Sequence, residues 1–300
     1  MSFALRTPLA AIAFVGLASP AFAAEITVQH AQGETTLEQN PKTVISFDLA
    51  SLDTLDELGI KVAGIPGSNL PGYLEKYAGD EYLKVGSLFE PDYEAVAAAA
   101  PDLIIVAGRS SGAYEELSKI APTIDLTNDW VGFEASVKQN ARVLGEIFEK
   151  SAEVETMIDD LDARIAEVKT VAADAGTGLI VLTSAGEVTA YGPGSRFGWI
   201  HDSLGVVPAV ADVEAATHGD AVSFEFILEA DPDWLFVLDR DAAVGAGSAL
   251  AVLDNQLVNE TKAAKEGHIV EIDPVRAYIV NGGLTAFRVL VEQVGTALGA

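Results

Sequence analysis

Four arginines occupy positions from which they could bind an anion together. Arg109 and Arg240 each follow a short apolar segment that is typical of a buried strand. Arg196 comes directly after a Gly-Pro-Gly-Ser turn, and Arg276 lies in the loop after the segment IVEIDP. A guanidinium group donates two parallel hydrogen bonds to paired oxygens and keeps its charge at physiological pH. One such arginine could simply pair with a nearby aspartate, whereas three or four that converge favour an anionic ligand.

A histidine and a tyrosine near these arginines could act as metal ligands. His218 lies in the segment ATHGDAVSFE, and Tyr278 comes two residues after Arg276. Taken alone, such a histidine is more often a satisfied surface or core residue, and such a tyrosine is more often a packing residue. A bare zinc or manganese site is not indicated, because no i,i+4 pair or His-rich run occurs among the four histidines, His30, His201, His218 and His268.

An internal repeat contains two of the four arginines. EAVAAAAPDLIIVAGR runs from Glu94 to Arg109, and EFILEADPDWLFVLDR runs from Glu225 to Arg240; both fit Glu, six residues, Pro-Asp, six residues, Arg. Each copy predicts a short helix that the glutamate opens, a break at Pro-Asp, a buried strand and then the arginine. Ligands of parallel α/β sheets bind beyond the carboxyl ends of the strands, so both arginines should face one cleft between two lobes.

Short apolar segments alternate with helical spacing along the chain, which indicates an α/β protein with parallel sheets covered on both faces. The expected strands are KTVISF, KVAGI, DLIIVAG, GLIVLTSA, WLFVLD and GHIVEI. From Ser151 to about Ala173 apolar residues recur every three or four positions, which predicts one long helix with Ser151 as its N-cap. We therefore expect two Rossmann-like lobes, residues 24–150 and 175–300, joined by a single long helix at 151–174, with the ligand cleft between the lobes.

Composition and charge restrict the partners of the chain. Among the 300 residues, 45 acidic side chains stand against 18 basic ones, and the formal net charge of -27 argues against nucleic acid as a partner. Residues 1–23 combine Arg6, an apolar run and the ending Ala-Phe-Ala, which is typical of a cleavable signal peptide. The chain has no cysteine, so we expect no disulfide, no thiolate metal site and no lipid anchor. These features favour an exported, unanchored protein of the periplasm.

Several stretches together resemble one protein family. The most telling are YGPGSRFG and the series HG, SFE, PD and DR in HGDAVSFEFILEADPDWLFVLDR; PKTVISFDLASLDTLDELGI and VNGGL extend the similarity over nearly the whole chain after the signal peptide. The chain is similar to the class III periplasmic binding proteins of ATP-driven importers, and within them to the branch that binds ferric catecholate siderophores. This resemblance implies two α/β lobes, one long connecting helix and a shallow cleft.

The resemblance also implies roles for the residues singled out above. A trio of arginines, which corresponds to Arg109, Arg196 and Arg240, would surround the anionic iron complex. In this branch a histidine and a tyrosine complete the coordination of iron when the siderophore supplies only four oxygens. The matching positions are His218 and Tyr278, which would then be direct ferric ligands.

Three further residues receive expectations. Arg276 is a candidate for an additional contact with the ligand. Class III proteins dock on their permease through one acidic residue on each lobe, and Glu94 and Glu225 match those positions. A favourable charge in the first turn of a helix is the alternative role for both glutamates.

These features favour a carrier, without enzymatic activity or an intrinsic cofactor, that captures a ferric catecholate siderophore and delivers it to an inner-membrane ABC transporter for iron uptake. We expect a monomer that serves a dimeric permease. The same scaffold could instead bind haem, cobalamin or a hydroxamate siderophore, although several arginines suit a strongly anionic guest better. An exported α/β hydrolase or transferase is the alternative from another class. The sequence has no Gly-x-Ser-x-Gly elbow, no phosphate-binding Gly-Lys-Ser/Thr loop and no zinc-protease His-Glu pair.

Overall fold

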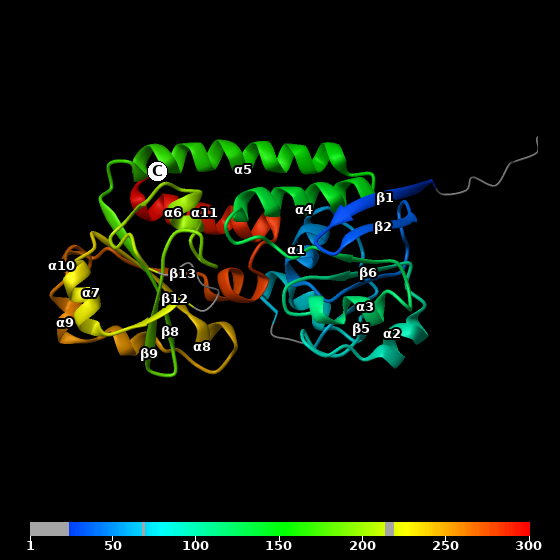
Figure 1. Ribbon diagram of the computed structural model, residues 1–300, viewed down its shortest axis with the longest axis horizontal. Coiled ribbons are helices and arrows are strands. Elements are labelled where there is room, and N and C mark those ends of the chain that lie inside the picture. The colour runs from blue at the N-terminus through cyan, green and yellow to red at the C-terminus, as the bar shows by residue number, and fades with distance from the viewer. Residues whose placement is uncertain (1–23, 68–69, 214–218) are drawn as a thin grey trace, which may run out of the picture.

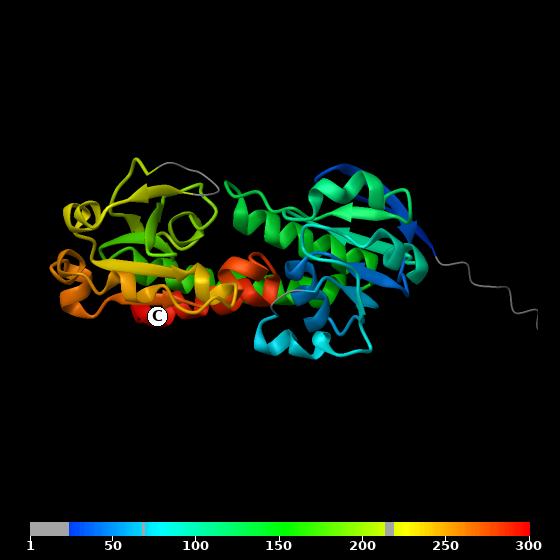
Figure 2. The same ribbon diagram turned by 90° about the horizontal axis from the view of Figure 1, so that it is seen from below.

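The computed structural model describes residues 24–67, 70–213 and 219–300, which form two α/β lobes. The expected signal peptide and His218 lie outside the described residues. In Figure 1 the amino-terminal lobe is on the right and the carboxy-terminal lobe on the left, and the long helix α5 (Ser151–Ala172) runs above both. Figure 2 shows the same lobes from below, with the orange-red segment η4 (Val275–Val280) between them.

The amino-terminal lobe contains a five-stranded parallel sheet in the order β5-β4-β3-β6-β7, preceded by an antiparallel hairpin of β1 and β2. The strands are β1 (Glu25–His30), β2 (Gly33–Glu38), β3 (Val44–Ser46), β4 (Gly64–Ile65), β5 (Leu83–Lys84), β6 (Leu103–Val106) and β7 (Thr123–Asp125). The helices are α1 (Leu49–Glu57), η1 (Gly72–Ala78), α2 (Tyr93–Ala99), η2 (Ser111–Ala113), α3 (Tyr114–Leu117) and α4 (Phe133–Ile147).

The carboxy-terminal lobe contains a six-stranded sheet in the order β11-β9-β8-β12-β13, with β10 paired to β8. The strands are β8 (Thr177–Ser184), β9 (Glu187–Tyr191), β10 (Val207–Pro208), β11 (Asp220–Val222), β12 (Trp234–Asp239) and β13 (Ile269–Ile272). The helices besides η4 are α6 (Trp199–Asp202), α7 (Phe224–Ala230), α8 (Arg240–Ala243), η3 (Leu250–Leu253), α9 (Gln256–Asn259), α10 (Lys262–Glu266) and α11 (Leu284–Leu298).

The predicted α/β class with two lobes is confirmed, but the second sheet is mixed and not wholly parallel. β9 runs antiparallel to β8 because the tight turn Ala185–Gly186 leads straight back, and both turn residues have positive φ. The long apolar strands behave as expected for strands covered on both faces. In β6, Leu103 and Ile105 pack into a different hydrophobic cluster from Ile104.

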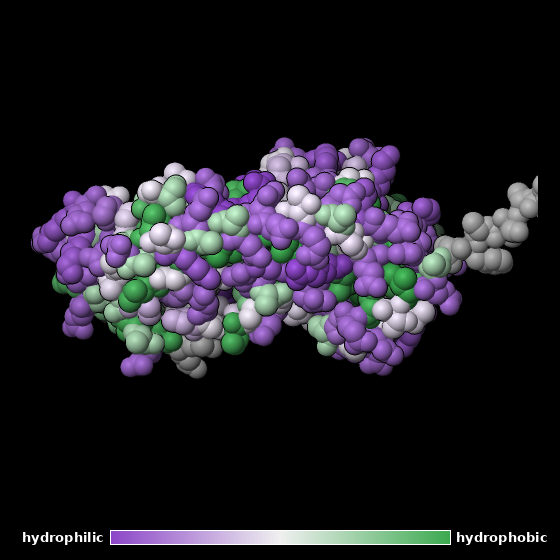
Figure 3. All heavy atoms as spheres, turned by 90° about the horizontal axis from the view of Figure 1, so that it is seen from above, coloured by the Kyte–Doolittle hydropathy of each residue, from purple (hydrophilic) through white to green (hydrophobic). Residues whose placement is uncertain are grey.

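Helix α5 has one apolar stripe along its length. Val154, Ile158, Leu161, Ile165 and Val168 are buried at helical spacing, and the helix packs against α4 and α11. At 1.5 Å per residue its 22 residues extend roughly 33 Å, enough to reach across both lobes. The helix begins at Ser151, as the expected range 151–174 has it, but Lys150 and not Ser151 occupies the N-cap. The face that α5 crosses is largely hydrophilic (Figure 3).

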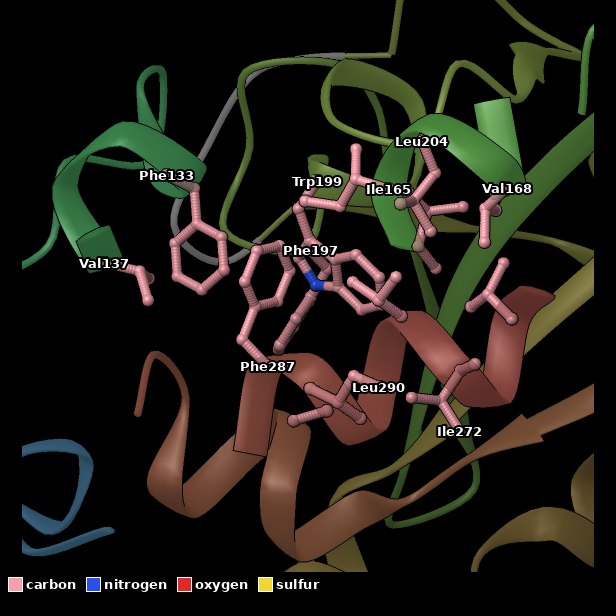
Figure 4. Close-up of a cluster of buried hydrophobic side chains, with 14 of the residues drawn as sticks. Phe133, Val137, Ile165, Val168, Phe197, Trp199, Leu204, Ile272, Phe287 and Leu290 are labelled. Atoms are coloured by element: carbon pink, nitrogen blue, oxygen red, sulfur yellow. The ribbon is translucent and has the colours of Figure 1, made fainter. Parts of the chain in front are cut away.

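Helix α11 is locked into a core that involves both lobes. The ring of Phe287 lies between Phe133 of α4 and Trp199 of α6, as Figure 4 shows. Its centre is 5.2 Å from that of Phe133 and 5.5 Å from that of Trp199, and both contacts are edge-on. Such edge-to-face pairs add to the hydrophobic gain from burying the rings. The last helix of the chain therefore holds the two lobes together from inside.

The internal repeat appears as two matching structural units. Helices α2 and α7 have side-chain N-caps, Asp92 and Ser223, and each ends in a left-handed residue just before Pro-Asp. The aspartate of each Pro-Asp pair then accepts backbone N–H bonds from the start of a neighbouring segment: Asp102 from Lys42 and Thr43, and Asp233 from Thr177. In each unit these bonds fix where the strand begins, and so also the position of the arginine that follows the strand.

Candidate ligand-binding site

A cleft of about 450 Å³ lies where η4 meets the amino-terminal lobe. Its volume falls within the usual range for sites that bind small molecules. The lining comes from both halves of the chain: Phe47, Asp48, Leu49, Leu88, Phe89, Ala107, Gly108, Arg109, Thr127, Asn128, Trp130, Arg196, Tyr278, Ile279, Val280 and Asn281.

Arg109 reaches the cleft from the carboxyl end of β6, as its place in the repeat predicts. Its Nη2 donates to the main-chain carbonyl of Tyr278 at 2.6 Å, and its Nη1 donates to the carbonyl of Ile279 at 3.2 Å. The backbone before it is held by a bond from the N–H of Gly108 to Thr127 Oγ1 at 2.7 Å. The guanidinium therefore crosses from the amino-terminal lobe to η4.

Arg196 reaches the same carbonyl from the other lobe by a different route. Since β9 is antiparallel, its end does not lie at the carboxyl edge of the parallel strands, and the turn after it must redirect the chain. Ser195 Oγ donates to the carbonyl of Gly192 at 2.6 Å, and the N–H of Gly194, with φ +71°, donates to Asp202 at 2.7 Å. The Nη2 of Arg196 then donates to the Tyr278 carbonyl at 2.8 Å.

Arg240 contacts Tyr278 at its hydroxyl. It is the first residue of α8, behind β12, and its Nε donates to Tyr278 Oη at 3.0 Å. Asp239 is fully buried as the N-cap of α8, while the neighbouring Asp241 lies 3.6 Å from the guanidinium of Arg240. Arg240 is therefore partly paired with an aspartate, and it meets the other two arginines only at Tyr278.

The three guanidinium groups surround one half-buried phenol. Their central carbons lie 4.5 Å (Arg196), 5.6 Å (Arg109) and 5.7 Å (Arg240) from the centre of the Tyr278 ring. Burial alone would raise the pKa of Tyr278. The hydrogen bond from Arg240 and the charges of all three arginines outweigh it and lower the pKa below its ordinary value. The site is thus arranged to stabilise negative charge at the Tyr278 oxygen.

Burial also affects the charged groups that line the cleft. Burial lowers the pKa of Arg109 and of Arg196, and the charge of Arg109 lowers that of Arg196 further. Arginine nevertheless stays protonated, so desolvation and mutual repulsion remain as costs that an anion between the two would offset. Asp48 is half-buried in the lining; desolvation raises its pKa, against the bonds from Ser51 and the charge of Arg109.

Arg276 does not line the cleft. Its guanidinium pairs with Asp273 and lies 4.5 Å over the ring of Tyr73, which belongs to η1. The additional ligand contact expected from Arg276 stays a prediction, since this residue is not part of the cleft lining. His218 lies outside the described residues, so the structure does not place it.

Glu94 and Glu225 lie at equivalent points on the two lobes. Each is exposed in the first turn of a helix, α2 or α7, that leads into β6 or β12. Because each helix runs back along its strand, its amino end is at the carboxyl edge of the sheet, on the side of the arginines. Bonds from its own backbone N–H and from Ser223 lower the pKa of Glu225.

Sequence reasoning missed three residues of the cleft. Trp130 lies beneath Arg196, whose guanidinium carbon is 5.9 Å from the ring, and Phe89 lines the opening with 66% of its surface exposed. The side-chain oxygen of Asn281, with its amide oriented to suit both neighbours, accepts a bond from Arg196 Nε at 3.1 Å. The segment VNGG could have pointed to Asn281, whereas no local signal marks Trp130 or Phe89.

None of the helices in the described part of the chain has both the length and the apolar character needed to span a membrane.

Known proteins resemble this chain over nearly its whole length. It is 42% identical over 280 residues to the petrobactin-binding protein YclQ of Bacillus subtilis, covering 91% of this chain and 88% of that protein. The crystal structure of YclQ matches with a TM-score of 0.90 over 92% of this chain and 99% of that one. The ferric-anguibactin-binding protein FatB of Vibrio anguillarum is 32% identical over 277 residues, covering 90% and 86%.

A further solved structure is the periplasmic catecholate-siderophore binding protein VctP from Vibrio cholerae, which is 35% identical and has a TM-score of 0.85 over 92% of this chain and 99% of that one. The family model described as periplasmic binding protein matches residues 44–275, well over half of the chain. The chain therefore belongs to the periplasmic binding protein family.

Proposed function

We propose that this chain captures a ferric siderophore of the catecholate type and delivers it to an ABC importer. The observation that carries the proposal is the meeting of Arg109, Arg196 and Arg240 at Tyr278, in a chain whose net charge is -27. Similar proteins are described as binding petrobactin, ferric anguibactin and catecholate siderophores, which supports the same class of guest. Like its family, the protein would bind a substrate without transforming it.

The arginines would bind the guest by exchanging one acceptor for better ones. Arg109 and Arg196 now donate to a neutral carbonyl, and a catecholate oxygen would replace it with a charge-assisted bond. Such bonds contribute roughly twice as much as bonds between neutral groups. A strongly anionic guest should therefore be favoured over haem, cobalamin or a neutral hydroxamate. Trp130 and Phe89 supply aromatic surface for catechol rings.

Tyr278 and His218 are the proposed iron ligands when the siderophore supplies only four oxygens. A phenol must lose its proton before it can bind ferric iron, and the surrounding arginines already lower the pKa of Tyr278. The role of His218 rests on the similarity of its segment to the ferric catecholate branch. With a hexadentate guest neither residue would be needed as a ligand.

Transfer to the importer would use the glutamate at the start of each repeat. Glu94 and Glu225 are the proposed contacts, one on each lobe, for a permease dimer that a single carrier molecule bridges. We further propose export to the periplasm with removal of residues 1–23, and lobes at 24–150 and 175–300 joined by a helix at 151–174. No intrinsic cofactor and no catalytic step belong to this proposal.

Visible absorption spectroscopy tests the proposed guest. The mature protein is titrated with a hexadentate ferric tris-catecholate and, in parallel, with a neutral ferric hydroxamate. We expect a saturable complex with the catecholate, seen as retention of its charge-transfer band with the protein on gel filtration, and much weaker retention of the hydroxamate. Equal retention of both would reject anionic selectivity, and retention of neither would reject siderophore capture.

A further inference from the structure

The turn 281–283, which joins η4 to α11, is pressed against the amino-terminal lobe. Asn281 has φ +45° and Gly282 has φ +123°, a conformation that favours glycine. A Cβ atom added to Gly282 would lie 2.1 Å from Asn128 Nδ2, and one added to Gly283 would lie 2.3 Å from Asp53 Oδ2. The two glycines thus permit a backbone approach that a larger residue would prevent.

Asp53, from α1, binds the amino end of α11. Its Oδ2 accepts the backbone N–H groups of Thr285 and Ala286, both at 3.0 Å, and its Oδ1 accepts the hydroxyl of Tyr73 at 2.6 Å. Only 1% of Asp53 is exposed. The N-cap of α11 is Gly283, which has no side chain to satisfy these amides. The carboxylate of Asp53 on α1 therefore accepts the amide hydrogens that an N-cap side chain would otherwise bind.

The same turn is connected to the arginines of the cleft. The Asn281 amide accepts Arg196 Nε at 3.1 Å and donates to the carbonyl of Ala277 at 3.1 Å. One residue beyond Ala277, the carbonyl of Tyr278 accepts both Arg109 and Arg196. A shift of the turn would therefore move the acceptor that holds two arginines from opposite lobes.

We propose that Asp53 is a positioning residue for the cleft, whose ionised carboxylate fastens the turn 281–283 and so holds η4 and Tyr278 where the arginines meet. Asp53 itself touches no lining residue through a hydrogen bond and would act through the backbone of α11 and η4. We call the contact between the Asp53 carboxylate and the amino end of α11 the latch. The proposal goes beyond the function proposed above, because this contact exists in the protein without a guest.

The groups that face Asp53 set the pH at which the latch responds. Burial raises the pKa of Asp53 to about 6, against the bonds from Tyr73, Ala286 and Thr285 and the charge of Arg276. Arg276 lies over Tyr73 and is itself paired with Asp273. Asp56, on the same helix, is instead bound to Lys76 and Tyr77. Protonation as the pH falls through about 6 replaces charge-assisted bonds to α11 with weaker neutral ones.

Hydrogen–deuterium exchange of the protein without any siderophore tests the latch directly. Exchange can occur through a local opening that frees the amides of Thr285 and Ala286 but leaves Asp53 buried. Protection of these amides, corrected for intrinsic exchange, should then drop about tenfold between pH 7.5 and pH 5, because a neutral carboxyl holds them less strongly. Asp53→Asn, which resembles the protonated form, should show the low value at both pH values. Tyr73→Phe removes a bond that lowers the pKa of Asp53, so the midpoint should move to higher pH.

Asp102→Asn is the matched control, because Asp102 also accepts two backbone N–H groups but lies away from α11. It should keep the pH response of the wild type at residues 285 and 286. If Asp53→Asn lowers protection but keeps the wild-type pH response, Asp53 is merely structural and the proposal fails. An unchanged midpoint in Tyr73→Phe would also overturn it.

An affinity measurement extends the test to the cleft and rests on the proposed function. With a hexadentate ferric catecholate, wild type should lose about fivefold more affinity than Asp53→Asn between pH 7.5 and pH 5, because a less ordered site binds more weakly. Equal losses in both proteins would show that the latch does not reach the arginines. If neither protein binds, the proposed function fails, while the exchange experiment still decides the latch.

Discussion

Tyr278 receives hydrogen bonds from Arg109 and Arg196 at its carbonyl and from Arg240 at its hydroxyl. The carbonyl organises the cations, while the hydroxyl gains acidity from them. This double role explains why a tyrosine that looks like an ordinary packing residue in the sequence is central to the site. The π-helical turn η4 suits it, since irregular helical turns of this kind are frequent at functional sites.

Spectrophotometric titration of the tyrosines should therefore single out Tyr278. Its phenol should ionise below the ordinary tyrosine pKa, whereas burial raises the pKa of Tyr191 to about 12 and also raises those of Tyr73 and Tyr77. The early absorbance change near 295 nm should be missing in Tyr278→Phe. Because a lowered phenol pKa stabilises the fold only in alkaline solution, this variant should lose little ionisation-linked stability at pH 7. An identical titration curve for the variant would contradict the assignment.

Arg240→Ala should weaken an anionic guest far more than a neutral one. A hydrogen bond to a charged group contributes about 1.5–3 kcal/mol, so the ferric catecholate should lose roughly tenfold to a hundredfold in affinity. Arg142→Ala is the matched control, since Arg142 pairs with Glu155 away from the cleft. Fluorescence quenching titrations with both guests measure the effect. Equal losses for the catecholate and a neutral hydroxamate would count against an electrostatic role.

Asp53 should also affect global stability, in the opposite direction from its effect on the local opening, because global unfolding exposes the carboxylate to water. Its pKa is raised from 3.8 to about 6 in the fold, so its contribution is fully present below 3.8 and is lost as pH rises through about 6. The free energy of unfolding of Asp53→Asn relative to wild type should therefore rise by about 2 kcal/mol between pH 4 and pH 7.5. Urea unfolding at both pH values measures it. A constant difference would show that Asp53 has an ordinary pKa.

Among the elements, the turn between η4 and α11 leaves no room for a side chain at Gly282 or Gly283. In Gly283→Ala the new Cβ would meet Asp53 at 2.3 Å, so α1 and α11 must separate and the variant should lose about 1–3 kcal/mol of stability. Gly72→Ala places its Cβ in open space and should change stability by less than about 0.5 kcal/mol. Thermal unfolding of the two variants provides the comparison. Similar melting temperatures would mean that the contact relaxes without cost.

Elements whose signals are local were predictable from the sequence. The Pro-Asp break and the apolar run after it act within about ten residues, so the repeat and the place of Arg109 and Arg240 followed from it. The antiparallel course of β9 comes from the tight turn Ala185–Gly186, which the alternation of apolar and helical segments does not reveal. Arg196 therefore reached the cleft by an unforeseen route. Besides its local pair with Asp273, Arg276 lies over the ring of Tyr73, some 200 residues away in sequence, and no local pattern indicates that contact.

For the molecule as a whole, binding and docking should be separable. Glu94→Arg combined with Glu225→Arg should leave siderophore affinity within about twofold, because both side chains are exposed and away from the cleft lining. Uptake of labelled iron by cells should be abolished, since a positive charge would replace the negative one at each of the two proposed docking contacts. The control is Glu90→Arg combined with Glu229→Arg, which changes the net charge by the same amount at positions close in sequence to Glu94 and Glu225. Normal uptake by the first pair would leave only a helix-dipole role for these glutamates.

The bond between Asp53 and the amide of Thr285 spans 232 residues of sequence. Contacts of such separation form late in folding, because the long intervening chain must first be ordered. The amino-terminal sheet can assemble from nearby segments, but the acceptor for Arg109 and Arg196 arrives only with the final stretch of the polypeptide. If the chain is exported as proposed, its amino end crosses the membrane first. A partly translocated molecule would then contain Arg109 and Arg196 but would still lack Tyr278, whose carbonyl both of them bind. Cargo could then be captured only after export is complete.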